Sequence, residues 1–178
     1  MKTIEIKLFS FNELNEKAKE KALNEHRYME VEDDFWSEGV IENWKEILEK
    51  QGFEEPKILY SGFGSQGDGA CFTCKSIDFE KFENGEYKKA DVSAYIEHSY
   101  RYFFATSTNV CIETEESVSD DLSNEIEKAI KDKREEIGNK IYRDLEEAYS
   151  HATSDECIIE CFEANDYTFE ENGDMRNA

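Results

Sequence analysis

The sequence predicts an α+β fold: an antiparallel sheet of about five strands packed by helices, with one long helix in the second half of the chain. Two kinds of pattern indicate this class. Apolar and polar residues alternate over several short runs, as in half-buried strands. Between Leu122 and about Tyr149, isoleucine and leucine recur at intervals of four and seven residues, as on one face of a helix. A chain of 178 residues with 38% hydrophobic residues can bury one core, so we predict a single domain over residues 1–178.

Capping residues and glycines mark the boundaries in the first half of the chain. The spacing of Ser10–Glu13 is that of a capping box, so a helix should begin there at once and run to about Tyr28. Gly52 is a typical stop for a second helix. Phe35 and Trp36, at the start of that helix, are expected to be core or rim aromatics rather than a stacking platform. The predicted elements are a strand at 2–9, helices at 10–28 and 35–51, and strands at 57–62 and 70–79.

The second half is predicted to contain a strand pair, the long helix and a short helix. Strands at 92–98 and 109–115 should pair antiparallel across the aromatic segment between them. The run Thr153-Ser154-Asp155-Glu156 is a helix start, because serine and aspartate accept hydrogen bonds from the free amides of a first turn. A last short strand is expected near Tyr167. We expect residues 170–178 to form a frayed acidic tail.

Net charge is the strongest global property of the sequence. Forty-three Asp and Glu against twenty-one Lys and Arg give a formal charge of −22, well beyond what keeps a small domain soluble. The charge is uneven, since the segment from Asp144 to Asp174 holds eleven acids and no lysine or arginine. Such a surface repels nucleic acid and anionic membranes, and it attracts basic proteins, including those that hold DNA or RNA. We therefore expect a protein partner with a basic surface, and neither a nucleic acid nor a membrane.

Four of the nine glycines fall in a short loop between two predicted strands, in the run Tyr60-Ser61-Gly62-Phe63-Gly64-Ser65-Gln66-Gly67-Asp68-Gly69-Ala70-Cys71-Phe72. A phosphate cradle would need a helix start and usually a lysine after the glycines, and neither follows. The spacing is also not that of a nucleophile elbow. Two interpretations stay open. The loop is a tight connection anchored by aromatic residues, or its amides bind a small anionic ligand. The ligand candidates are Ser65, Gln66, Gly67 and Asp68.

Five cysteines without a secretion signal indicate reduced thiols in a cytosolic protein. Cys71, Cys74, Cys157 and Cys161 could together form a four-thiolate zinc site. Buried cysteine also packs as a small hydrophobic residue, and we expect that role here, with no metal and no cofactor. The first five residues include an acid where the apolar part of a signal peptide would begin, and no apolar run approaches the ~20 residues of a membrane span. We expect a cytoplasmic protein.

The glycine run and the block Ser150-His151-Ala152-Thr153-Ser154-Asp155-Glu156 resemble those of a family of small phage and prophage proteins. In that family the loop commonly reads Ser-Gly-Phe-x-Ser-Gln-Gly-Asp-Gly-Ala, and Thr-Ser-Asp-Glu precedes a helix and an acidic tail. The resemblance is strongest over the second half of the chain and implies no known active site. It implies a protein that acts in the cytoplasm of a host cell.

These observations favour an inhibitor of host defence, similar to anti-CRISPR proteins that mimic DNA. Its carboxylates would occupy a basic nucleic-acid-binding surface of a CRISPR effector or another nuclease. The structural alternative is that the acids only keep the protein soluble. A nucleotide sponge that uses the glycine loop is the second functional hypothesis, and a hydrolase using Asp68 with His98 or His151 is the third. No catalytic residue is predicted with the first hypothesis. The predicted partner-binding residues are Glu32, Asp33, Asp34, Glu160, Glu163, Asp166, Glu170 and Glu171.

Overall fold

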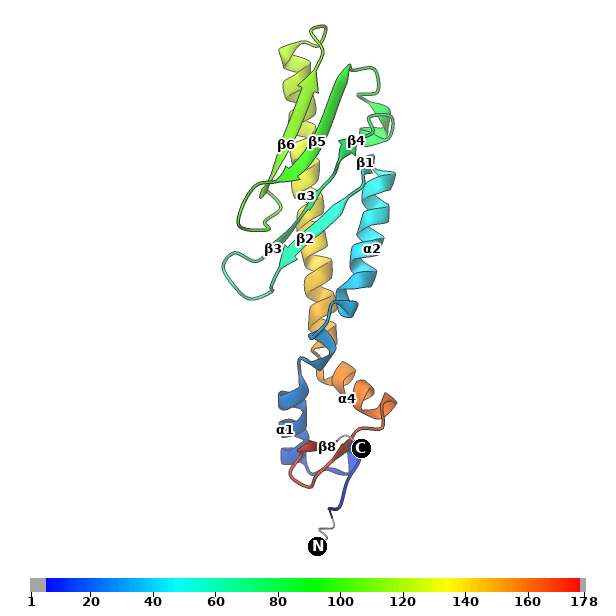
Figure 1. Ribbon diagram of the computed structural model, residues 1–178, viewed down its shortest axis with the longest axis vertical. Helices are drawn as coiled ribbons and strands as arrows, with labels where there is room; N and C mark the ends of the chain where they lie inside the picture. The colour runs from blue at the N-terminus through cyan, green and yellow to red at the C-terminus, as the bar shows by residue number, and fades with distance from the viewer. Residues whose placement is uncertain (1–5, 177–178) are drawn as a thin grey trace, which may run out of the picture. The chain divides into compact units, whose positions relative to one another are not determined.

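The structure is a computed structural model that describes residues 6–176 (Figure 1). The described chain groups into two compact units. The first unit comprises the described parts of Met1–Ser37 and Glu147–Ala178, and the second is Glu38–Glu146. Each unit is described by itself.

The first unit is held by a small apolar core in which aromatic residues from both ends of the chain meet. Helices α1 and α4 pack against each other. The elements of this unit are η1 (Phe11–Glu13), α1 (Glu16–His26), η2 (Met29–Val31), α4 (Asp155–Ala164), β7 (Thr168–Phe169) and β8 (Met175–Arg176). The buried core residues are Phe11, Leu14, Ala18, Ala22, Ile158, Phe162 and Phe169.

Two predictions near the N-terminus need correction. The capping box at Ser10 forms, but it caps the single 3₁₀ turn η1. Helix α1 begins later, where the Asn15 side chain accepts a hydrogen bond from the Ala18 amide at 3.1 Å. The predicted strand at 2–9 lies partly outside the described residues. Of its described residues only Phe9 pairs, in an isolated bridge with Phe169.

The C-terminal segment is also different from the frayed tail that the sequence predicts. Its described part forms a turn and strand β8, which pairs antiparallel with β7. Gly173 makes the turn possible, because its φ of +90° is strained for other residues and a Cβ there would lie 2.4 Å from the Ala18 carbonyl oxygen. The turn also forms an ion pair between Asp174 and Lys21 of α1. Lys21 is the main reason that the pKa of Asp174 is lowered.

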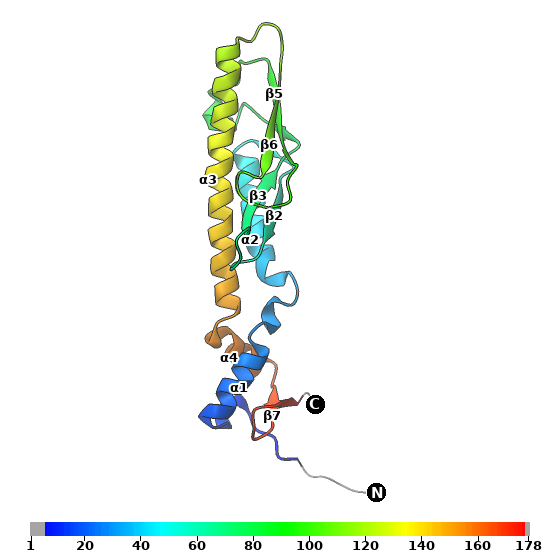
Figure 2. The same cartoon turned by 90° about the vertical axis from the view of Figure 1, so that its left-hand side faces the viewer.

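The second unit combines short antiparallel strand pairs with most of the two longest helices. Strand β1 pairs with β4, β2 with β3, and β5 with β6, while a bridge between Cys74 and Ile96 connects β3 and β4 to β5. Helix α3 runs along one face of these strands in both views (Figures 1 and 2). The elements are α2 (Phe35–Lys50), β1 (Phe53–Glu54), β2 (Lys57–Ser61), β3 (Gly69–Thr73), β4 (Ser76–Ile77), η3 (Phe82–Gly85), β5 (Val92–His98), β6 (Thr108–Thr114) and α3 (Asp120–Ala152).

Burial along α3 confirms the apolar stripe that the sequence periodicity predicts. Ile126, Ile130, Ile137, Ile141 and Leu145 are all buried. The α+β class, the antiparallel pairing and the long helix are therefore confirmed. The strands are shorter and more numerous than predicted: eight are described, in four pairs, rather than about five in one sheet. Segments such as the predicted strand at 70–79 are divided because the chain changes pairing partner along them.

Candidate functional site

Helix α4 carries a row of glutamates on its exposed face. The helix starts where the Ser154 hydroxyl accepts a hydrogen bond from the Cys157 amide at 3.2 Å. Ile158 and Phe162, four residues apart, are buried on one side. Glu156, Glu160 and Glu163 are exposed and follow the i, i+4, i+7 spacing that places residues on one face. We call these three residues the α4 ridge.

The α4 ridge forms no ion pair in the part of the chain that the structure describes, since none of the ion pairs within residues 6–176 includes any of its glutamates. One neutral contact is present: the Asn12 side-chain amide donates a hydrogen bond to Glu163 at 2.6 Å. At the start of the same helix, Asp155, which directly precedes Glu156, pairs with Arg27 at 2.7 Å. The ridge is thus a set of glutamates, none of them in a described ion pair, on a fixed helical spacing.

The acidic connector Glu32–Asp34 lies in the same unit and is exposed. Asp33 also has a structural role, because its carboxylate accepts a hydrogen bond from the Phe35 amide at 3.1 Å at the start of α2. Asp166 and Glu171 are exposed as well. These positions have the exposure that the partner-binding prediction requires.

Glu170 differs from the other predicted partner-binding residues. It is half-buried, and its carboxylate accepts a hydrogen bond from the Arg176 guanidinium at 2.6 Å. Its negative charge is therefore largely balanced by Arg176 within the β7–β8 hairpin. Glu156 was not among the predicted residues, although it is more exposed than Glu170. Its spacing of four residues from Glu160 could have identified it.

The glycine loop is organised around Asp68. The Asp68 carboxylate accepts hydrogen bonds from the amides of Gly64 at 2.9 Å and Ser65 at 2.6 Å. Phe63 stacks between Tyr60 and Tyr142, with ring centroids 6.3 and 5.5 Å away. The amides that a ligand anion would need thus donate to a carboxylate of the loop itself. This arrangement favours the interpretation of the loop as an anchored connection.

Substitution of Asp68 with alanine should destabilise the second unit by about 1–2 kcal/mol, because two amide hydrogen bonds to a carboxylate are lost. Urea unfolding followed by Trp44, which lies in that unit, measures the change. Ser65→Ala is the matched control: its backbone amide still donates to Asp68, and its side chain is exposed, so the expected change is below about 0.5 kcal/mol. Equal effects of the two substitutions would contradict this assignment.

Of the histidines proposed for a hydrolase, His98 makes its described contacts with its own loop. The Nε2 atom of His98 lies 3.0 Å from the Tyr102 carbonyl oxygen, and its ring stacks on Phe103. The described contacts of Asp68 and His98 therefore serve local structure, and no acid–base pair is formed from them.

The cysteines are all free thiols. Burial raises the pKa of Cys71 to about 11 and that of Cys74 to about 12. Burial, with a hydrogen bond to Glu30 at 2.8 Å, raises the pKa of Cys161 to about 11. These three thiols are protonated at neutral pH and poor nucleophiles. Within residues 6–176 no group of three or more His, Cys, Asp or Glu side chains is placed to hold a metal ion.

The fold and the α4 ridge together define a small acidic α+β protein. The chain belongs to the family described as "Domain of unknown function (DUF8835)", whose model matches residues 36–91 and 79–155. The matched residues include the whole second unit and end before the α4 ridge. No curated protein and no solved structure matches the chain. Among the described helices, none combines the length and the apolar composition needed to cross a bilayer.

Proposed function

We propose that this protein is a non-catalytic binding protein whose acidic first unit occupies a basic, nucleic-acid-binding surface of another protein. The observation that supports this most is the α4 ridge, three exposed glutamates that form no ion pair within the described residues. Acids that served only solubility could be interspersed with bases, as in the i, i+4 pairs of α3, such as Lys131 with Glu127 and Lys140 with Glu136.

The spacing of the ridge suits a surface that binds phosphates. With a rise of 1.5 Å per residue, neighbouring ridge glutamates are separated by about 4.5 to 6 Å along the helix axis. A cluster of Lys and Arg that holds a nucleic acid strand would meet a regular row of negative charge. Charge complementarity of this kind steers association and fixes orientation. Glu32, Asp33 and Asp34 add further negative charge to the same unit.

The specific form of this function that we propose is inhibition of a host-defence nuclease, such as a CRISPR effector, by a phage protein in the host cytoplasm. The similarity of the glycine run to phage proteins and the net charge of −22 support it. The nucleotide-sponge alternative is less favoured, because the amides of Gly64 and Ser65 donate to Asp68.

The triple variant Glu156→Gln, Glu160→Gln and Glu163→Gln tests the proposal. Three exposed ion pairs at about 0.5–1 kcal/mol each predict a loss of affinity of roughly tenfold to hundredfold for a short arginine- and lysine-rich peptide. The measurement is fluorescence anisotropy with a labelled peptide. Circular dichroism checks that α4 remains folded.

Helix α2 offers a matched control with the same change in net charge. Glu38, Glu42 and Glu46 are exposed and also lie on one helical face, but Glu42 pairs with Lys45 at 2.6 Å and Glu46 with Lys50 at 3.2 Å. Their triple glutamine variant should lose less than about threefold. If both triple variants weaken the peptide equally, binding depends on net charge alone and the ridge is not the binding surface.

A further inference from the structure

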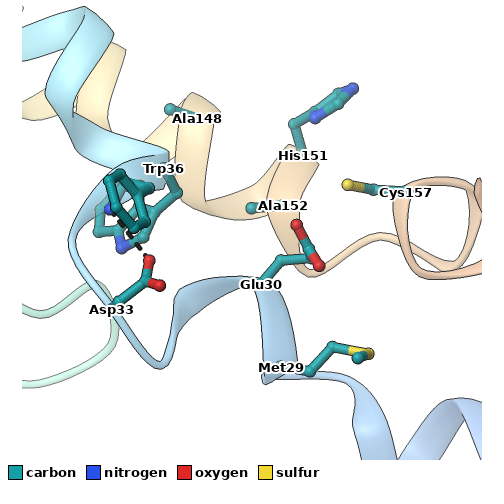
Figure 3. A pocket seen from close by; sticks show the side chains of 9 residues that line it. Met29, Glu30, Asp33, Trp36, Ala148, His151, Ala152 and Cys157 are labelled. Atoms are coloured by element: carbon teal, nitrogen blue, oxygen red, sulfur yellow. Dashed lines mark hydrogen bonds between the residues drawn. The ribbon is translucent and has the colours of Figure 1, made fainter. Parts of the chain in front are cut away.

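The first unit contains a pocket that the α4 ridge does not use. Its volume is about 470 Å³, and its walls come from η2, the start of α2, the end of α3 and α4. Figure 3 shows Trp36 and Asp33 on one side, His151 and Cys157 on the other, and Glu30 between them. The lining residues are Met29, Glu30, Asp33, Phe35, Trp36, Ala148, His151, Ala152 and Cys157.

Two aromatic side chains form one wall. Phe35 is 74% exposed, in contrast to the core or rim position that the sequence predicts for it. Trp36 is half-buried, and its ring meets Tyr149 edge-on with centroids 5.5 Å apart, so its orientation is fixed. The exposed Phe35 ring offers an open π face, which attracts cations.

Two carboxylates complete the site. Asp33 is held by its hydrogen bond from the Phe35 amide, next to the aromatic wall. Glu30 is held by the Cys161 thiol, which donates to it. None of the nine lining residues is lysine or arginine, and His151 is the one basic side chain among them. Two fixed carboxylates and the exposed Phe35 ring in one pocket are a combination that suits an organic cation.

We infer that this pocket binds the guanidinium group of an arginine side chain from the basic partner. The inference rests on the proposed function and assigns it an anchoring site. Arginine fits better than lysine, because its planar guanidinium can stack on an aromatic ring while it donates hydrogen bonds to a carboxylate at its edge. The α4 ridge supplies long-range attraction, and the pocket supplies a specific contact that selects an arginine-bearing surface.

The two tryptophans of the chain give a direct test, because Trp36 lines the pocket and Trp44 lies in the second unit, where its indole donates to Asp144. The probe is Nα-acetyl-arginine methylamide, titrated into the ¹⁵N-labelled protein. The Trp36 indole signal should shift with saturation in the millimolar range, and the Trp44 signal should stay in place. The citrulline analogue, which has the same shape without the charge, should cause no shift.

Variants assign the contact to the pocket. Phe35→Ala removes the exposed ring, and Asp33→Asn removes a charge while keeping an oxygen that can cap α2. Each should weaken binding of the arginine amide by about threefold or more. Tyr28→Ala is the control, since Tyr28 is 57% exposed in the same unit but does not line the pocket, and it should have no effect.

The outcomes separate this inference from the proposed function. An unmoved Trp36 signal, or equal shifts with arginine and citrulline amides, overturns the pocket assignment, even if the ridge variant still weakens the basic peptide. A saturable Trp36 shift that Phe35→Ala reduces supports the pocket. If that shift occurs while the ridge and control variants bind the peptide equally, the pocket assignment stands and the proposed ridge function fails.

Discussion

Substitution of Phe162 with alanine is expected to destabilise the first unit by about 3–5 kcal/mol, the typical cost of removing a buried phenylalanine ring. Phe162 is 1% exposed and lies at the centre of an aromatic cluster. Its ring centroid is 5.0 Å from Phe169 and 5.4 Å from Phe11, so it connects α4 to both ends of the chain. The core of this unit is small, and few other contacts can compensate.

Urea unfolding followed by the Trp36 signal measures this effect. Phe35→Ala removes the same ring from a position that is 74% exposed, and it should cost less than about 1 kcal/mol. Both variants lose the same phenylalanine ring, so the difference between their free energies of unfolding reports the effect of burial. Similar losses for Phe162→Ala and Phe35→Ala would show that the first unit is not organised around this cluster.

Substitution of Gly138 with alanine is expected to destabilise the second unit by about 1–3 kcal/mol, the usual cost of overpacking. Gly138 lies on the buried face of α3. A Cβ there would lie 2.7 Å from the Ala105 Cβ and 3.1 Å from the Ala70 carbonyl oxygen. Backbone atoms of two other segments must therefore move, because no flexible side chain can give way.

Gly39 is the matched control, since it also lies within a helix but a Cβ there meets nothing within 4 Å. Gly39→Ala should stabilise the protein by about 0.5–1 kcal/mol through helix propensity alone. The two substitutions are thus predicted to have opposite signs in thermal unfolding. A stabilising Gly138→Ala would mean that α3 does not approach Ala105 as closely as described.

Local patterns predicted the helices and turns well. The apolar stripe of α3 and the Gly52 stop follow from periodicity and from the φ of +93° that glycine tolerates. The capping box at Ser10 was less informative, because its spacing also fits a single 3₁₀ turn. Strand β7 is the short strand expected near Tyr167, but the turn after it and β8 were missed, since they depend on contacts with α1, such as Asp174 with Lys21, between residues far apart in sequence.

The sequence pattern also did not predict which charged residue is buried. Arg134 on α3 is 7% exposed and donates to the Thr108 carbonyl oxygen, although its residue type predicts an exposed position. Burial lowers its pKa. The acidic ridge could be predicted in part, because composition and helical spacing are local. The pocket could not, because four separate segments build it.

The salt dependence of peptide binding tests the central claim most directly. If the α4 ridge binds a basic surface, the affinity of the wild-type protein for the arginine- and lysine-rich peptide should fall at least tenfold between about 50 and 500 mM NaCl, because salt screens exposed charges. The Glu156→Gln, Glu160→Gln, Glu163→Gln variant should show a clearly shallower dependence. An affinity that salt leaves unchanged, or the same slope for both proteins, would contradict the account.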